Sequence, residues 1–317
     1  MSLVLPDWLD RAMPELVRDY LDPPPPMRAR HFCQSLERCV ENGRVADIRR
    51  DGTVDAVAGI EPLPWDSRHF GMGFARLGPI CLAPQLGEAA RMAAVEEIVE
   101  LALRWCRETG IAILLRRMVG ARVEEAAAFE QRGFRLVDSI ATLTAPASAL
   151  DPNIPVRPAV PADREALLAI ARDAFPHSRF LADRALDRNK AKAVYVNWLE
   201  TMLSGKTVGD KSGQGGIVLV AEYAGKAGGF IAMRRDRGLD ELVGRPVAPM
   251  EMFAVAEEAR GRGFGAALLA AARDWSARQG AELVEASTWT ASVAARRSYE
   301  RAGFSMRDTL LTFHRRV

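Results

Sequence analysis

The stretch that decides the fold is Met250–Ala267, which reads MEMFAVAEEARGRGFGAA. Its apolar first part, up to Val255, predicts a short strand, and Ala256–Ala259 predict a turn. Arg260–Gly265 then opens a helix. The glycines let a ligand approach the backbone, and the first amides of a helix carry unpaired N–H donors at the positive end of its dipole. The stretch therefore predicts a strand–loop–helix unit that binds an anion.

Taken alone, these glycines are also compatible with a plain glycine-rich turn between a strand and a helix. The Lys-Ser/Thr pair of a P-loop is absent, which argues against a nucleoside triphosphate. The stretch also lies too late in the chain, after a mixed strand region, for a dinucleotide-binding fingerprint with its downstream acid. A second motif is needed to decide between these interpretations.

That second motif lies about one strand and one turn further on, where Ser292, Ala295, Tyr299 and Gly303-Phe304 follow one another at helical spacing. Together with Arg260-x-x-Gly-x-Gly265 it resembles the GNAT acetyltransferase superfamily. The resemblance implies acetyl-CoA as cosubstrate, with its pyrophosphate on the glycine loop and its thioester beside the second helix. Ser292 stands where asparagine is usual in that superfamily, so the sequence departs from the family pattern at this one contact.

The chemistry that the resemblance implies is direct attack of an amine on a thioester carbonyl, without a metal. The amine must be neutral, the oxyanion needs fixed donors, and the leaving thiolate benefits from a proton. Tyr299 is the candidate proton donor, because phenol and thiol pKa values of about 10 and about 8.5 are close. The alternative is a core tyrosine with a satisfied hydroxyl. The implied cosubstrate-binding residues are Phe253, Ala254, Val255, Arg260, Gly261, Arg262, Gly263, Phe264, Gly265 and Ser292.

The chain also carries an internal duplication. Trp105–Gly110 matches Trp275–Gly280, and Phe129–Phe134 matches Tyr299–Phe304, both at a spacing of 170 residues. Each half predicts the same order of helices and strands, which indicates an α/β protein of tandem GNAT-like folds, with mixed sheets flanked by helices. The predicted helices are Ala89–Glu108, Val123–Gln131, Ala266–Arg278 and Val293–Arg301, and the predicted strands are Ile111–Leu115, Phe134–Leu143, Glu282–Ala286 and Phe304–Phe313.

The first copy is predicted to be degenerate. At the same spacing the glycine loop corresponds to Ala90–Val95, which has no glycine, and Tyr299 corresponds to Phe129, which has no hydroxyl. We therefore expect one active site per chain, with the first copy completing the sheet and lining the acceptor site. The proline-rich stretch Ala145–Pro161 predicts a linker. The expected domains are an N-terminal extension (1–55), in which Pro23–Pro26 separates two short helical stretches, a degenerate GNAT-like domain (56–150) and a catalytic GNAT domain (151–317).

Short segments narrow the resemblance. The chain resembles the TDP-fucosamine acetyltransferases, which acetylate a nucleotide-linked 4-amino-4,6-dideoxyhexose. The segments that carry this resemblance are Ile60–Asp66, Phe70-Gly71, Ala174-Phe175, Ser178–Phe180, and Tyr195 with Trp198. This resemblance runs from about residue 57 to the end of the chain. The acceptor-binding candidates are Ser178, Arg179, Phe180, Tyr195 and Trp198, for which ordinary helix packing is the alternative.

Two residues are candidates for the base that takes the proton of the amine. Asp138 lies on the strand after Gly133-Phe134, where the sugar acetyltransferases that this chain resembles also carry an acid. His177 is the alternative because of the ordinary pKa of imidazole. Each residue also has a non-catalytic alternative. Asp138 would then be an exposed acid at a strand end, and His177 a solvated histidine in a loop.

Composition excludes several other functions. Lys and Arg number 43 against 41 Asp and Glu, a net charge of +2, so a nucleic-acid partner is not expected. The apolar stretches are shorter than the roughly 20 residues of a membrane span. The N-terminus lacks the pattern of a secretory signal, and the four cysteines show no metal-ligand spacing, so we expect a cytoplasmic protein without a zinc site.

Three functions stay open at this stage. They are N-acetylation of a nucleotide-linked amino sugar, acetylation of another small amine by a GNAT enzyme, and acyl-CoA binding without catalysis. The second copy keeps both the glycine loop and the tyrosine, whereas the first copy has lost both. This difference disfavours acyl-CoA binding without catalysis. The sugar, the nucleotide, an acyl group other than acetyl, and whether the chain forms a homodimer cannot be deduced from the sequence.

Overall fold

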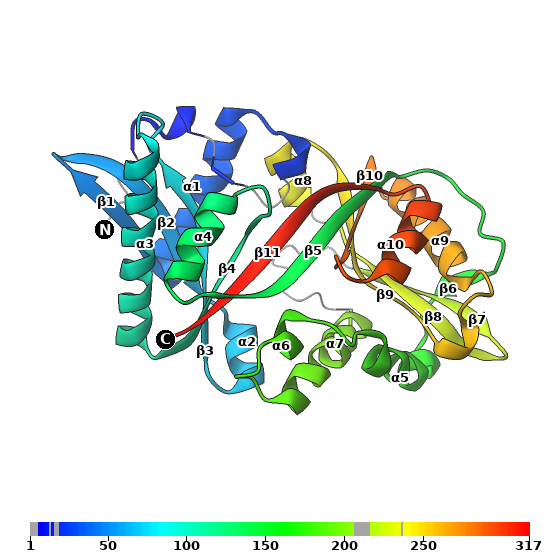
Figure 1. Ribbon diagram of the computed structural model, residues 1–317. Coiled ribbons are helices and arrows are strands. Elements are labelled where there is room, and N and C mark those ends of the chain that lie inside the picture. The colour runs from blue at the N-terminus through cyan, green and yellow to red at the C-terminus, as the bar shows by residue number, and fades with distance from the viewer. Residues whose placement is uncertain (1–5, 13, 16–18, 206–215, 236) are drawn as a thin grey trace. The chain divides into compact units, whose positions relative to one another are not determined.

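The computed structural model describes the chain except for residues 1–5, 13, 16–18, 206–215 and 236 (Figure 1). The chain forms two compact units. The first unit comprises Met1–Ser139, Leu242–Gly244 and Thr309–Val317, and the second comprises Ile140–Glu241 and Arg245–Asp308.

The first unit is a mixed sheet with helices on both faces. Its elements are η1 (Leu9–Arg11), η2 (Asp19–Leu21), α1 (Pro25–Asn42), β1 (Arg44–Arg50), β2 (Thr53–Pro62), α2 (Pro64–Phe70), β3 (Gly73–Leu82), α3 (Glu88–Thr109), β4 (Ile111–Val119), α4 (Val123–Gln131) and the start of β5 (Arg135–Pro146). The strand order is β1-β2-β3-β4-β11, and only β3 and β4 run parallel. One hydrophobic core lies under α3 and α4, which Figure 1 shows together, and a second core contains α1.

The second unit repeats this plan. Its elements are β6 (Val156–Pro158), η3 (Pro161–Asp163), α5 (Arg164–Ala174), α6 (Arg179–Ala182), α7 (Arg188–Leu203), β7 (Ile217–Tyr223), β8 (Lys226–Met233), α8 (Arg237–Val243), β9 (Val247–Val255), η4 (Glu257–Ala259), α9 (Phe264–Arg278), β10 (Leu283–Trp289), α10 (Val293–Arg301) and β11 (Ser305–Arg316). The strand order is β5-β10-β9-β8-β7-β6. One core lies under α9 and α10, and the other under α5 and α7.

The predicted α/β fold is confirmed, and its best-predicted elements are those that end in a glycine. Helices α4 and α10 have the bounds expected from the sequence. Helix α3 ends at Gly110, whose φ of 72° is the left-handed conformation that favours glycine at a helix end. Strands β1 and β2, which begin inside the expected N-terminal extension, form the first hairpin of the first sheet.

The final strand of each sequence repeat belongs to the unit formed mainly by the other repeat. Residues Ile140–Pro146 of β5 pair antiparallel with β10 in the second unit. Residues Leu310–Arg316 of β11 pair antiparallel with β4 in the first unit. Each sheet is therefore completed by a strand from the opposite half of the sequence.

The predicted counterpart of the glycine loop in the first copy was wrong. Ala90–Val95 lies inside helix α3, which begins at Glu88. The structural counterpart is Ala83–Gly87, because Gly87 precedes α3 as Gly263 precedes α9. The first copy therefore keeps one glycine, but at a φ of −68° instead of the 88° of Gly263. The constant spacing of 170 residues holds only after this loop.

Among the described residues, no helix is long and apolar enough to cross a bilayer. Within the same part of the chain, no group of three or more His, Cys, Asp or Glu side chains is placed to hold a metal ion. The four cysteines are not joined in disulfides, and burial raises the pKa of Cys81 and Cys106 to about 12, so both thiols stay protonated.

Candidate active site

The candidate site of the second unit lies where β9 and β10 stop pairing. The two strands run parallel from Val247 and Leu283 only as far as Pro249 and Glu285. Strand β9 continues to Val255, and β10 continues to Trp289. We call the stretches of β9 and β10 beyond these last pairs the unpaired seam of the second unit. It presents a strand edge on which an extended ligand could form hydrogen bonds.

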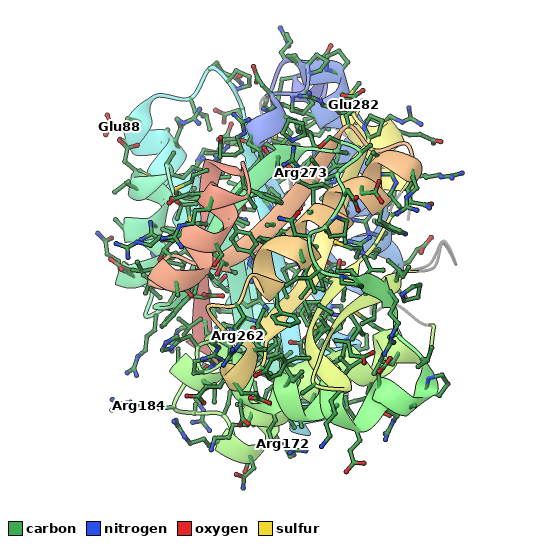
Figure 2. The ribbon with its side chains drawn as sticks, turned by 90° about the vertical axis from the view of Figure 1, so that its right-hand side faces the viewer. Glu88, Arg172, Arg184, Arg262, Arg273 and Glu282 are labelled. Carbon is green, nitrogen blue, oxygen red and sulfur yellow. The ribbon has the colours of Figure 1, made fainter. Side chains whose placement is uncertain are left out.

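The glycine loop follows directly from β9. After the single turn of η4, Arg260–Gly263 leads into α9, whose start is marked by Arg262 in Figure 2. Gly261 and Gly263 have φ values of 73° and 88°, which L side chains rarely adopt. Both glycines are exposed, and the first amides of α9 have no partner within the helix. The arrangement fits the predicted anion site.

Close packing fixes the start of α9 against β9. A Cβ atom on Gly265 would lie 3.4 Å from the Cζ atom of Phe253 and 3.8 Å from Val255. The guanidinium of Arg262 lies 5.3 Å from the centre of the Tyr223 ring, and the Tyr223 ring meets Phe264 edge-on. The structure thus places the predicted strand and loop residues, Phe253 to Val255 and Arg260 to Gly265, side by side.

Tyr299 projects from α10 into the core of the same unit. Its hydroxyl donates to the Sδ atom of Met250 at 3.7 Å, and its ring lies 5.8 Å from that of Phe253. Met250 is the first β9 residue beyond the last pair with β10, so the hydroxyl reaches the beginning of the seam. Burial raises the pKa of Tyr299, and the phenol therefore stays protonated.

A β-bulge brings Glu251 to this place. Met233 pairs with Met250 and Ala232 with Met252, so Glu251 is the extra residue of β9. Its carboxylate accepts a hydrogen bond of 2.8 Å from the Nε atom of Arg234, and the side chain is largely buried. Sequence reasoning did not single out Glu251. A lone acid within an apolar strand was the available signal.

An aromatic pair lies at the end of β10, and only one of its two residues, His177, was a candidate from the sequence. The ring of His177, in the loop after α5, stacks on Trp289 at the end of β10 with a centroid distance of 4.3 Å. His177 is exposed. The backbone N–H of Ser292 donates to the carbonyl of Trp289, which holds Ser292 at the start of α10. The structure therefore groups His177, Trp289 and Ser292, and Trp289 had not been predicted.

The predicted acceptor-binding residues are mostly engaged in packing. The hydroxyl of Ser178 accepts from the N–H of Leu181 and caps α6, and Arg179 lies over the ring of Phe180 at 4.4 Å. The Tyr195 ring stacks on Phe175 at 4.4 Å. Tyr195 and Trp198 both border the core under α5 and α7. Their role in acceptor binding stays a prediction.

Asp138 lies in the first unit, on β5. Its side chain is 6% exposed, and one carboxylate oxygen lies 4.0 Å from the Nη2 atom of Arg117. Asp138 is therefore a buried carboxylate beside a cation. The alternative interpretation from the sequence, an exposed acid at a strand end, does not describe it. Its role as a base stays a prediction.

Comparison with known proteins identifies the family. Residues 165–304, which contain β9, the glycine loop and α10, match the model of the acetyltransferase (GNAT) family. The chain carries a GNAT acetyltransferase domain. GNAT proteins are acyl-CoA-dependent N-acyltransferases, and residues 165–304 match the domain of that class.

Two relatives have names that refer to sugars. The chain is 28% identical over 189 residues to the spore coat polysaccharide biosynthesis protein SpsD of Bacillus subtilis, a match that covers 58% of this chain and 60% of that protein. It is 24% identical over 258 residues to the dTDP-fucosamine acetyltransferase of Escherichia coli O6:H1, which covers 81% of this chain and 98% of that enzyme.

Solved structures support the fold. A GCN5-related N-acetyltransferase from Sphaerobacter thermophilus matches with a TM-score of 0.61 at 18% identity, over 99% of this chain and 97% of that one. A tandem GNAT protein from the clavulanic acid biosynthesis pathway matches with a TM-score of 0.51 at 15% identity, over 87% of this chain and 84% of that one. The predicted arrangement of tandem GNAT-like folds is confirmed.

Proposed function

We propose that the chain transfers an acetyl group from acetyl-CoA to the amine of a nucleotide-linked amino-deoxy sugar. The proposal that acetyl-CoA is the cosubstrate rests on the unpaired seam of the second unit, where β9 leads into a glycine loop at a helix N-terminus. The acceptor class is supported by the similarity to a dTDP-fucosamine acetyltransferase over most of both chains. The alternative is another small amine, as in many GNAT enzymes.

In this proposal the glycine loop and the edge of β9 bind the cosubstrate. The amides at the start of α9 bind the pyrophosphate, and Arg260 and Arg262 add positive charge beside it. The backbone of Phe253–Val255 pairs with the extended pantetheine arm, because the edge of β9 has no pairing with β10 there. Fixed N–H groups also stabilise the oxyanion that forms when the amine attacks.

Tyr299 acts in the proposal as the proton donor to the leaving thiolate. The amine nitrogen forms a bond to the acetyl carbon, and the carbon–sulfur bond breaks. The sulfur takes the phenolic proton, the amine gives its proton to the base, and the phenolate recovers a proton from solvent. The phenol is protonated at physiological pH, because burial raises its pKa. The raised pKa makes it a weaker acid, but the same low-polarity surroundings disfavour a bare thiolate.

Glu251 joins Asp138 and His177 as a candidate base. It lies two residues beyond the last pair of β9 with β10, on the same strand as the proposed thioester contacts. A carboxylate there can attract the ammonium form of the acceptor and accept its proton. Arg234 fixes its orientation through the bond of 2.8 Å.

Replacing Glu251 with Gln is expected to lower kcat by about 10²-fold or more if Glu251 is the base, since general bases contribute roughly this much. Asp138→Asn and His177→Gln are the matched comparisons. A Glu251→Gln enzyme with an unchanged kcat would assign the base to whichever of the other two variants loses activity.

Cosubstrate binding is testable at Gly261, where a Cβ atom would meet no atom within 4 Å. Asn and Asp tolerate the left-handed conformation and have nearly equal size, so Gly261→Asn and Gly261→Asp differ mainly in one charge. Gly261→Asp should raise the Kd for acetyl-CoA by about tenfold or more over Gly261→Asn, through repulsion of the pyrophosphate. Equal affinities by calorimetry would remove the pyrophosphate from this loop.

The acceptor is tested by assaying the full-length protein with acetyl-CoA and TDP-, UDP- and GDP-linked amino-deoxy sugars. Free thiol release and the mass of the acetylated product are the two measurements. We expect transfer to at least one nucleotide sugar, with kcat/KM at least about tenfold above that for the free amino sugar, because the nucleotide adds binding energy. Transfer to polyamines or peptide N-termini but to no sugar would favour the alternative acceptor.

A further inference from the structure

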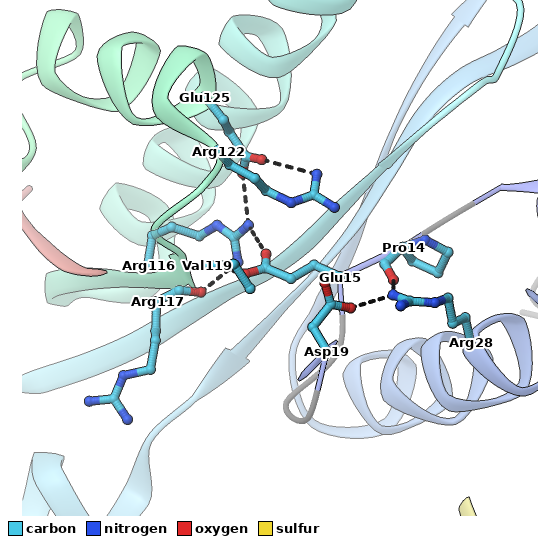
Figure 3. A network of polar contacts seen from close by, with 9 residues as sticks. All are labelled: Pro14, Glu15, Asp19, Arg28, Arg116, Arg117, Val119, Arg122 and Glu125. Atoms are coloured by element: carbon cyan, nitrogen blue, oxygen red, sulfur yellow. Dashed lines mark hydrogen bonds and ion pairs between the residues drawn. The ribbon is translucent and has the colours of Figure 1, made fainter. Parts of the chain in front are cut away.

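A buried network of charges occupies the first unit (Figure 3). The guanidinium of Arg116 is 1% exposed, and its Nη2 atom donates to Glu15 at 2.6 Å and to Glu125 at 2.7 Å. Its Nη1 atom donates to the carbonyl of Arg117 at 2.7 Å. The second oxygen of Glu15 accepts the backbone N–H of Val119. Glu15 is therefore held by a cation and an amide together.

This network lies at the first unit's counterpart of the unpaired seam. Strands β3 and β4 pair in parallel only as far as Leu77 and Arg116, although β3 continues to Leu82 and β4 to Val119. Arg116 thus stands at the last pair, and Val119 stands at the end of β4. The carboxylate of Glu15 connects the two. The ring of Phe129 lies 5.9 Å from the guanidinium.

The second unit has small side chains at the matching positions. At the spacing of 170 residues, Arg116 corresponds to Ala286, Glu125 to Ala295 and Phe129 to Tyr299. The second unit therefore keeps two alanines near its tyrosine, where the first unit has a buried arginine and a glutamate. The seam of the first unit is filled by side chains of the chain itself.

Two anchors hold the segment that carries Glu15. Before it, Trp8, Leu9 and Ala12 are buried in the core of α1, and the indole N–H of Trp8 donates to the carbonyl of Val54 at 2.7 Å. The guanidinium of Arg28 binds the carbonyl of Pro14, directly before Glu15, and the carboxylate of Asp19, further along the chain. Described residues on both sides of Glu15 are thus held by contacts within the first unit.

We propose that Glu15 is an intramolecular ligand of the first unit, whose Arg116 guanidinium and Val119 N–H form a carboxylate-binding site in its seam. Only the comparison of this site with the unpaired seam of the second unit, as a binding site for acetyl-CoA, rests on the proposed function. The site itself stands on the contacts of the first unit. Without Glu15, the guanidinium of Arg116 keeps Glu125 but loses one of its two buried carboxylate partners. The backbone N–H of Val119 loses its acceptor as well, so the first unit should be less stable without this ligand.

The test uses Glu15→Ala in the full-length protein. Its melting temperature should fall by about 5 °C, because the buried guanidinium of Arg116 loses one of its two carboxylates and the N–H of Val119 loses its acceptor. Sodium formate or acetate, added at about 0.2 M, should restore at least half of this loss by entering the vacated site, whereas sodium chloride at equal ionic strength should not. Asp10→Ala is the control, because Asp10 is on the same segment and its side chain is 74% exposed.

A second comparison covers the case in which Glu15→Ala does not fold. Glu15→Met combined with Arg116→Met and Glu125→Met removes the whole buried ion network and should be more soluble and more thermostable than Glu15→Met alone. A Glu15→Ala protein as stable as Asp10→Ala, no rescue by either carboxylate, or a combined variant no better than Glu15→Met alone would each overturn the proposal. None of these measurements depends on acetyl transfer, so they are independent of the proposed function.

Discussion

Tyr299→Phe is expected to lower kcat for acetyl transfer by about 10²–10⁴-fold, the usual contribution of a positioned proton donor. The variant keeps the ring that packs 5.8 Å from Phe253 and 5.5 Å from Phe304, and it loses only a weak hydrogen bond of 3.7 Å to the sulfur of Met250. The fold and the Kd for acetyl-CoA should therefore change little. Steady-state kinetics and calorimetry on the same preparation separate the two effects.

The pH profile gives an independent check on this role. Burial raises the pKa of Tyr299 above its ordinary value of 10.0, so the phenol should stay protonated, and kcat should show no loss from its ionisation up to about pH 10. Tyr20→Phe, in the first unit, is the control for phenol removal. If Tyr299→Phe has the kcat of Tyr20→Phe, then Tyr299 is a packing residue.

The bounds of a helix could be predicted from the sequence where an amphipathic pattern is followed by a glycine. Helix α3 has an amphipathic pattern that stops at Gly110, and α10 lies between Ser292 and Gly303, so local chemistry alone specifies these ends. Pro25 and Pro26 illustrate the opposite case. Prolines there were expected to separate two short helical stretches, but they form the first turn of the 18-residue helix α1, where their missing N–H groups are not needed.

Features that depend on distant residues could not be predicted. The spacing of 170 residues suggested the wrong counterpart for the glycine loop, because α3 begins within the aligned segment and extends over more residues than α9. The role of Glu15 depends on Arg116, which is 101 residues away in sequence. The bulge at Glu251 exists only in the pairing of β9 with β8. No local pattern encodes such contacts.

The exchange of final strands leads to the second large prediction. A chain that starts at Asp151 contains the whole expected catalytic domain, but it lacks Ile140–Pro146 of β5. Those residues pair with all of β10 and contribute Ala141, Leu143 and Ala145 to the core, each at most 1% exposed. Their removal exposes a central strand and part of a core. This cost is comparable to a typical total stability of about 5–15 kcal/mol, so we expect no folded, active product.

Complementation distinguishes this explanation from a catalytic role of the first copy. Fragment 1–150 carries β5, which pairs with β10, and fragment 151–317 carries β11, which pairs with β4. Coexpression of the two fragments should therefore give a soluble complex with acetyl-CoA binding, whereas each fragment alone should aggregate through its unpaired strand edges. A fragment that begins at Arg135 keeps β5 and is the matched comparison for 151–317. If 151–317 alone were folded and bound acetyl-CoA as tightly as the full chain, β5 would not be needed to complete the second sheet.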